Sequence, residues 1–128
     1  MILENMPHLR IETNVKSRDI GDMQKCVEEF QEEFQKIIGK PDQYVAVTLI
    51  PDVAMTMGKD ANVPTAQATL TSIGKLGIEE NKKISAELFP IINNKLKVES
   101  DKCYIIFNDV KTSDVGYKGT TFHEILGR

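Results

Sequence analysis

"LRIETNV", residues 9–15, alternates apolar and polar side chains. Leu9, Ile11 and Thr13 fall on one side and charged or amide residues fall on the other, which predicts a β-strand with one buried face. Pro7 stands just before this strand, directly after Met6. A proline inside a chain is an amide without basicity, whereas a proline at a chain terminus is a secondary amine that can act as a base. The chemistry open to Pro7 therefore depends on whether a form of the chain begins there.

The segment after this strand predicts a helix over residues 20–38. Apolar residues recur there in steps of three and four, which describes one helix face. The preceding "SRD", residues 17–19, offers N-caps, Gly39 suits the C-cap, and Pro41 prevents continuation. A β-rich run, "QYVAVTLI" at 43–50, follows, and then a short segment around "VAMTMG" at 53–58.

A second cycle of the same kind occupies the rest of the chain. "AQATLTSIG" at 66–74 and "KCYIIFND" at 102–109 predict strands, and residues 78–98 between them have a helical pattern. Pro90 lies inside that pattern and predicts a kink or local opening near Ala86, whose carbonyl loses its helical donor.

The two cycles predict one β-α-β unit used twice. From Leu9 to Tyr44 is 35 positions, and from Gln67 to Cys103 is 36. Strands joined through a helix usually run parallel with a right-handed crossover. We therefore expect an α+β fold, an α/β two-layer sandwich of duplicated β-α-β units, with a four-stranded mixed sheet and two helices on one face. The other sheet face would be bare, and assembly through sheet edges would cover it.

Composition narrows the class of protein. The chain has 128 residues, 41% of them hydrophobic and 27% charged, with a net charge of -3, which fits one globular domain over 1–128. Its scattered basic residues give no nucleic-acid footprint, and its apolar runs are too short to span a membrane. The two cysteines, Cys26 and Cys103, are far apart and lack metal-site spacing, so we expect reduced core thiols, no metal and no cofactor. These features favour a cytoplasmic protein, and any secretion would take a leaderless route.

Six separated blocks resemble the macrophage migration inhibitory factor family, within the tautomerase superfamily. They are "MPHLRIETNV", "GKPDQYVAV", "LTSIGKLG", "NKKISAELFPIINNKL", "DKCYIIFND" and "DVGYKGTTF". The resemblance implies a tautomerase/MIF-like fold and a homotrimer with active sites between neighbouring subunits. It also implies keto–enol tautomerisation of phenylpyruvate-like acids and, as in animal members, a leaderless secreted cytokine that binds a cell-surface receptor.

The resemblance makes Pro7, as an N-terminal amine, the catalytic base. Such a base needs a pKa near the working pH, and an apolar pocket containing the positive charge of Lys40 would lower it and also hold a substrate carboxylate. The family match assigns Lys40 and Ile73 to substrate binding, and Tyr104 to the pocket of the neighbouring subunit. The remaining pocket positions implied by the match are Tyr44, Val115, Phe122 and Ile106.

Each of these residues also has a purely structural interpretation. Pro7 suits a turn, Lys40 a solvated position after a helix, and Tyr104 a strand, while Ile73 is core in either case. His8 would rim the pocket or point out of it, and we expect no catalytic role for it.

Four departures from the family pattern bear on function. Residues 1–6 form an N-terminal extension ahead of Pro7, and "HEILGR" at 123–128 forms a tail that would cross a neighbouring subunit or hang free. Ile106 replaces an asparagine that in many members donates to the substrate. Thr65 and Ala68 replace the Cys-x-x-Cys thiols of some members, so thiol-oxidoreductase activity is not expected. Three hypotheses therefore remain open: a tautomerase, a non-catalytic, cytokine-like binding protein, and a structural family member whose proline is blocked by the N-terminal extension.

Overall fold

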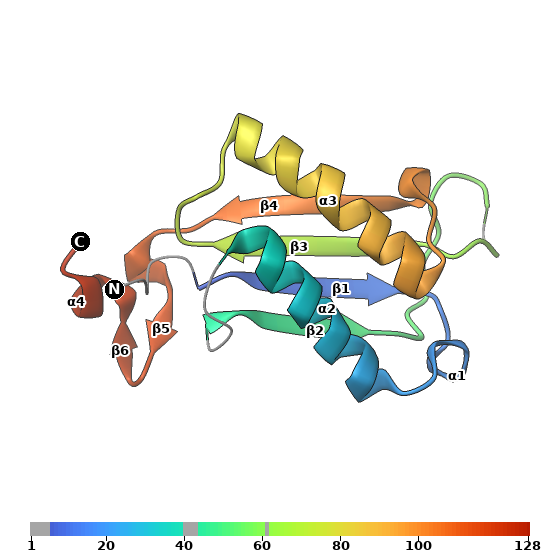
Figure 1. The fold of residues 1–128 in the computed structure, drawn as a ribbon, viewed down its shortest axis with the longest axis horizontal. Helices are drawn as coiled ribbons and strands as arrows, with labels where there is room; N and C mark the ends of the chain where they lie inside the picture. The colour runs from blue at the N-terminus through green and yellow to red at the C-terminus, as the bar shows by residue number, and fades with distance from the viewer. Residues whose placement is uncertain (1–5, 40–43, 61) are drawn as a thin grey trace.

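Four strands form one mixed sheet in the order β2-β1-β3-β4, and two long helices cover one of its faces (Figure 1). The computed structural model describes residues 6–39, 44–60 and 62–128. Strand β1 runs parallel to β2 and antiparallel to β3, and β3 runs parallel to β4. Both predicted β-α-β units are thus present, joined through their first strands. The main elements are β1 (His8–Thr13), α2 (Met23–Ile38), β2 (Ala46–Ile50), β3 (Ala66–Ser72), α3 (Ile78–Leu96) and β4 (Cys103–Asp109).

The first helical segment is two helices rather than the single helix predicted from residue 20. A one-turn helix, α1 (Ser17–Ile20), ends at Gly21, whose φ of 94° breaks the helical path. Asp22 then caps α2, because its carboxylate accepts the Lys25 backbone N–H at 3.0 Å. The apolar period runs through this break, which is why it hid the interruption.

Helix α3 continues across Pro90 without interruption, from Ile78 to Leu96. Pro90 and Ala86 both lie on the exposed side of the helix, so water can satisfy the Ala86 carbonyl that lacks a proline N–H donor. Helix α3 therefore does not open at Pro90, whereas the expected kink stays a prediction. The helix ends two residues earlier than expected, because Lys97 adopts the left-handed conformation with a φ of 60°.

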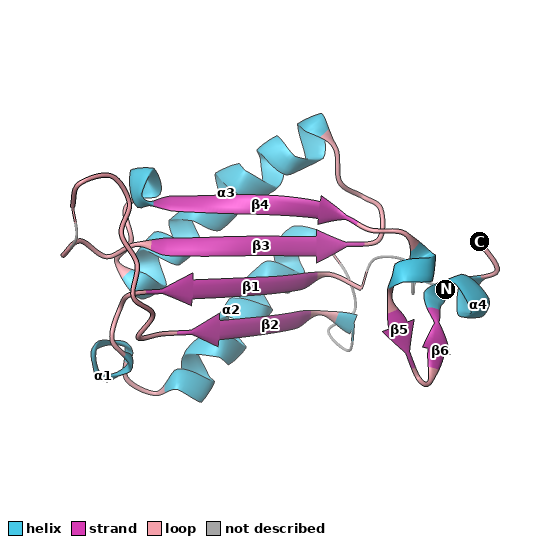
Figure 2. Ribbon diagram, turned by 180° about the vertical axis from the view of Figure 1, so that it is seen from behind, coloured by secondary structure: helices cyan, strands magenta, loops and turns pink. Residues whose placement is uncertain are grey.

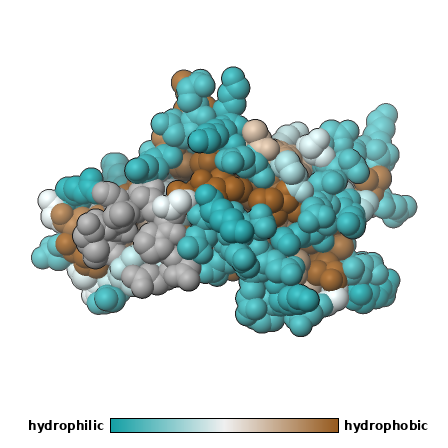
Figure 3. Space-filling model, viewed as in Figure 1, coloured by the Kyte–Doolittle hydropathy of each residue, from teal (hydrophilic) through white to brown (hydrophobic). Residues whose placement is uncertain are grey.

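The core lies between the sheet and the two helices. The inward side chains of β1, Leu9 and Ile11, are fully buried and pack with Phe30 and Phe34 of α2 and Leu88 of α3. The outer sides of the helices are mostly hydrophilic, with an apolar strip between them (Figure 3). The faces of the helices and of β1 that the sequence predicted to be apolar are thus the faces buried in the core.

The opposite face of the sheet carries no helix (Figure 2). On β4, which is an edge strand, Cys103 is buried while the alternate residues Tyr104 and Ile106 are 60% and 49% exposed. Two large apolar side chains on an unpaired edge are a feature that subunit contacts commonly cover.

The C-terminal segment folds into small elements beside the sheet. They are the 3-10 turn η3 (Thr112–Asp114), the hairpin of β5 (Gly116–Tyr117) and β6 (Thr120–Thr121), and the helix α4 (Phe122–Leu126). Lys118 and Gly119 turn the hairpin with φ values of 53° and 82°, as a two-residue turn of the mirror-image type requires. Residues 122–126 are helical and fold back onto η3, so the tail does not hang free, whereas a contact with a neighbouring subunit stays a prediction.

Candidate active site

A cavity of about 330 Å³ opens where β1 begins, between that end of the sheet and the β5–β6 hairpin. Its walls are mainly apolar and aromatic, and they come from three separated parts of the sequence. The residues that matter most for its chemistry are Pro7, His8, Tyr44, Val115, Tyr117 and Phe122. The fold therefore gathers four of the residues assigned from the sequence, Pro7, Tyr44, Val115 and Phe122, around one space.

Pro7 is buried at this cavity, with less than 2% of its surface exposed. Its carbonyl accepts the backbone N–H of Ala46 at 3.1 Å, which fixes it at the start of the β1–β2 pair. Its nitrogen is joined to Met6, so in this chain that nitrogen is an amide and has no basic lone pair. The position suits a base in an apolar site, but only a form with a free Pro7 amine could provide one.

Three aromatic rings form one wall of the cavity. Tyr117 stacks on Phe122, with ring centroids 5.1 Å apart and planes 8° apart, and meets Tyr44 edge-on at 6.3 Å. The Phe122 backbone N–H donates to the Val115 carbonyl at 3.0 Å, which ties the two ends of the hairpin together. Such a wall offers a flat surface to an aromatic ligand.

Sequence reasoning missed Tyr117 as a wall residue. It lies inside the "DVGYKGTTF" block, between Val115 and Phe122, which were both assigned. The signal was the Lys-Gly pair at 118–119, since a two-residue turn places Tyr117 opposite Thr120 and next to the start of α4.

His8 lines the same cavity from the bare side of the sheet. Its Nε2 lies 3.1 Å from the Thr48 hydroxyl oxygen. Burial, and to a smaller degree the charge of Arg10, lowers the pKa of His8 from its ordinary value of 6.5. A neutral imidazole is therefore the form present at neutral pH, and it adds no positive charge to the site.

The other assigned residues lie apart from this cavity. Ile73 is buried just beyond the end of β3 and is not part of the cavity lining. Tyr104 pairs with Gln67, which pairs with Glu12, so it lies at the opposite end of the sheet from His8. Ile106 shares its edge strand, and Lys40 lies outside the described residues. One chain thus assembles only part of the site that the sequence assigned.

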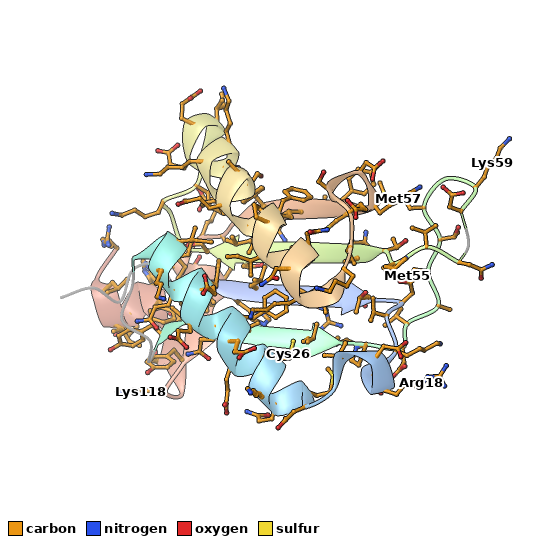
Figure 4. The ribbon with its side chains drawn as sticks, turned by 45° about the vertical axis from the view of Figure 1, so that its right-hand side comes forward. Arg18, Cys26, Met55, Met57, Lys59 and Lys118 are labelled. Carbon is orange, nitrogen blue, oxygen red and sulfur yellow. The ribbon has the colours of Figure 1, made fainter. Side chains whose placement is uncertain are left out.

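A larger cavity, of about 520 Å³, lies at the other end of the sheet, beside the loop that carries Met55. Figure 4 shows Met55, Met57 and Lys59 at that end and Lys118 of the hairpin at the other. Two of the lysines that line it are engaged: Lys95 lies 3.4 Å from the Glu29 carboxylate, and Lys97 donates to a backbone carbonyl at 3.1 Å. Among the described residues that line it, none is a buried nucleophile or base.

The cysteines are free thiols in the core, as expected. Burial raises the pKa of Cys26, and it raises the pKa of Cys103 to about 11, so neither thiol is activated. Among residues 6–39, 44–60 and 62–128, no three His, Cys, Asp or Glu side chains are grouped to hold a metal ion. Within those residues there is also no helix long and apolar enough to cross a membrane.

Comparison with known proteins identifies the family. The family model described as "Macrophage migration inhibitory factor (MIF)" matches residues 6–123. The macrophage migration inhibitory factor of Xenopus laevis is 33% identical over 117 residues, which cover 91% of this chain and 99% of the relative. A homolog of the same factor from Trichuris trichiura is 36% identical over 118 residues, covering 91% of this chain and all of that protein.

Solved structures give the same result. The macrophage migration inhibitory factor of Trichinella spiralis superimposes with a TM-score of 0.82 at 34% identity, covering 90% of this chain and 99% of that one. The homologue from Prochlorococcus marinus gives 0.81 at 28% identity, covering 90% and 98%. Fold, sequence and the extent of the match agree, and the chain belongs to the macrophage migration inhibitory factor family.

Proposed function

We propose that this protein is a keto–enol tautomerase of phenylpyruvate-type acids in a form that begins at Pro7. The observation that carries the proposal is the burial of the Pro7 ring in an apolar, aromatic cavity at the start of β1. The match to the family begins at Met6, one residue earlier. Translation from Met6 followed by removal of that methionine would leave Pro7 as a secondary amine.

The reaction follows from the chemistry of that amine. The Pro7 nitrogen takes a proton from the carbon next to the substrate carbonyl. The electron pair of that C–H bond forms the carbon–carbon double bond, while the π pair of the carbonyl moves to its oxygen. A proton delivered to that oxygen by water or by the Pro7 ammonium gives the enol, and the reverse path regenerates the ketone. Burial favours the neutral amine and so supplies the base at neutral pH.

The substrate contacts divide between ring and carboxylate. The Tyr117–Phe122 stack and Tyr44 would hold the aromatic ring. Lys40, which directly follows the Gly39 cap of α2, would bind the carboxylate as the family match implies. Ile73 stays a proposed substrate-binding residue, as the family match implies, although it does not line this cavity within one chain.

The same proposal includes a homotrimer. Tyr104 and Ile106 are exposed on an edge strand and lie far from Pro7 within one chain, so they can join a site only across a subunit boundary. With Ile106 in place of a polar donor, that side of the site would favour apolar groups. Sedimentation should give a trimer at micromolar concentration, and a stable monomer would count against a site shared between subunits.

A second candidate is a non-catalytic, cytokine-like binding protein that acts on a cell-surface receptor. The linkage of Pro7 to Met6 favours it, because every form with that linkage lacks the base. Such a protein would be made in the cytoplasm and released by a leaderless route. The two roles need not exclude each other, since one concerns the cavity and the other the outer surface.

The test compares two forms of the chain in a phenylpyruvate tautomerisation assay. The form beginning at Pro7 should be active, the 128-residue form should have little or no activity, and Pro7→Gly in the short form should lose most of the rate. Equal rates in the long and short forms would overturn the assignment of Pro7 as the base.

A further inference from the structure

Helix α4 lies at the end of the part of the chain that the family match covers. The match stops at residue 123, whereas α4 runs from Phe122 to Leu126. The Thr121 hydroxyl caps the helix by accepting the Glu124 backbone N–H at 3.3 Å. Gly127, with a φ of 73°, closes the other end by donating to the His123 carbonyl at 2.9 Å. The tail is thus a capped helix with a defined geometry.

Two hydrogen bonds attach this helix to the segment that precedes the hairpin. The Thr112 hydroxyl of η3 donates to the backbone oxygen of Arg128, beyond the C-terminal end of α4. The Phe122 N–H donates to the Val115 carbonyl at the N-terminal end of α4. The Val115–Phe122 hydrogen bond therefore closes the hairpin, and the Thr112–Arg128 hydrogen bond holds the far end of α4 against η3.

The hairpin needs such support. Strands β5 and β6 are two residues long each, and an isolated two-stranded hairpin is marginally stable at best in water. Tyr117 at the end of β5 and Phe122 at the start of α4 are the stacked pair of the cavity wall. Whatever holds α4 against η3 also holds these two rings in place.

We propose that α4 is a clamp that positions the aromatic wall of the Pro7 cavity and thereby sets its affinity for aromatic acids. The proposal rests on the proposed function only in taking such an acid as the ligand. Thr112 is a positioning residue, because it acts on Phe122 and Tyr117 through the helix and does not line the cavity. The clamp should affect binding of the ring and leave proton transfer at Pro7 unchanged.

The test is Thr112→Val, which removes the hydroxyl at nearly constant volume, in the form beginning at Pro7. Thr112→Ser keeps the hydroxyl and serves as the rescue variant. Thr120→Val, on the exposed surface of β6, is the matched control for losing a threonine hydroxyl from this segment. For phenylpyruvate, Thr112→Val should raise KM by about two- to tenfold, the range for one net hydrogen bond, with kcat unchanged. Ser at the same position and the Thr120 control should keep the parent KM.

Two further measurements do not depend on catalysis. Hydrogen exchange of the Phe122 amide should speed up in Thr112→Val and not in the other two variants. Titration with 3-phenylpropionate, a non-reacting aromatic acid, should show weaker binding in Thr112→Val alone. If the parent binds this probe but has no tautomerase activity, the proposed function fails while the clamp stands. Unchanged exchange and unchanged probe affinity in Thr112→Val would overturn the clamp, and so would an equal loss in Thr112→Ser.

Discussion

Replacing Phe122 with leucine tests the contribution of the cavity wall separately from that of the rest of the core. Phe122 is 2% exposed and stacks on Tyr117 at 5.1 Å. Leucine would lose the stacking, worth about 0.5–1.5 kcal/mol, and part of the apolar burial. We expect a total loss of about 1.5 kcal/mol in the free energy of unfolding, which lowers Tm by about 5 °C for a domain of this size.

Phe34→Leu is the matched control. Phe34 is 0% exposed in the core between α2 and the sheet, so shortening it costs a similar amount, about 1–1.5 kcal/mol, without touching the cavity. Thermal unfolding should therefore show that both variants are destabilised. Every sample needs the same protein concentration, because association of subunits makes Tm depend on concentration.

Binding should distinguish the two variants. Phe122→Leu in the form beginning at Pro7 should bind phenylpyruvate about two- to tenfold more weakly, the range set by the lost ring contact. Phe34→Leu should bind it as the parent does. If both variants lose affinity equally, or if Phe122→Leu loses none, the cavity at Pro7 is not where the aromatic ring binds.

Three further predictions concern groups outside the wall. Because burial lowers the pKa of His8 below 6.5, the unfolded chain binds this proton more readily, and the stability present above pH 6.5 is lost as the pH falls through the folded pKa. In urea denaturation at a series of pH values, His8→Gln should weaken this pH dependence of the free energy of unfolding, and an unchanged pH dependence would refute the prediction. With a pKa of about 11 and 4% exposure, Cys103 should resist iodoacetamide at about pH 8 until urea unfolds the chain, as mass spectrometry would show; fast labelling of the native protein would contradict its burial. Pro90→Ala should restore the helical donor to the Ala86 carbonyl and raise the free energy of unfolding by about 1–3 kcal/mol, whereas no gain in the urea midpoint would mean that α3 is already adapted to the proline.

The sequence alone predicted the sheet and its helices, because periodicity reports burial directly. Alternation over residues 9–13 and the repeated spacing of the two cycles were enough to predict two β-α-β units with parallel strands and helices on one face of the sheet, but neither pattern contains the antiparallel pairing of β1 with β3. The break at Gly21 was missed, since an apolar period does not register a single residue of positive φ. The helix of the tail was missed because five residues carry too little periodicity to stand out from a loop.

The site was predictable in part, for a different reason. The fold of a single chain brings Tyr44, Val115 and Phe122 around Pro7. Their roles toward a substrate stay predictions. Tyr104 and Ile106 lie at the far edge of the same sheet, so no property of a single chain can test their assignment. The position of Tyr117 in the cavity wall depends on the turn at Lys118, and a pattern of apolar residues does not reveal such a turn.

In a form that begins at Pro7, the buried position of this residue should make its free amine a base at neutral pH. The most direct test is to titrate the Pro7 nitrogen by NMR in the form that begins at Pro7, beside the pH profile of kcat/KM. We expect a pKa below the roughly 7.7–8.0 of an ordinary chain-terminal amine, and an acid limb of the rate profile with the same midpoint. An ordinary or raised pKa, or a rate profile that does not follow this titration, would contradict it.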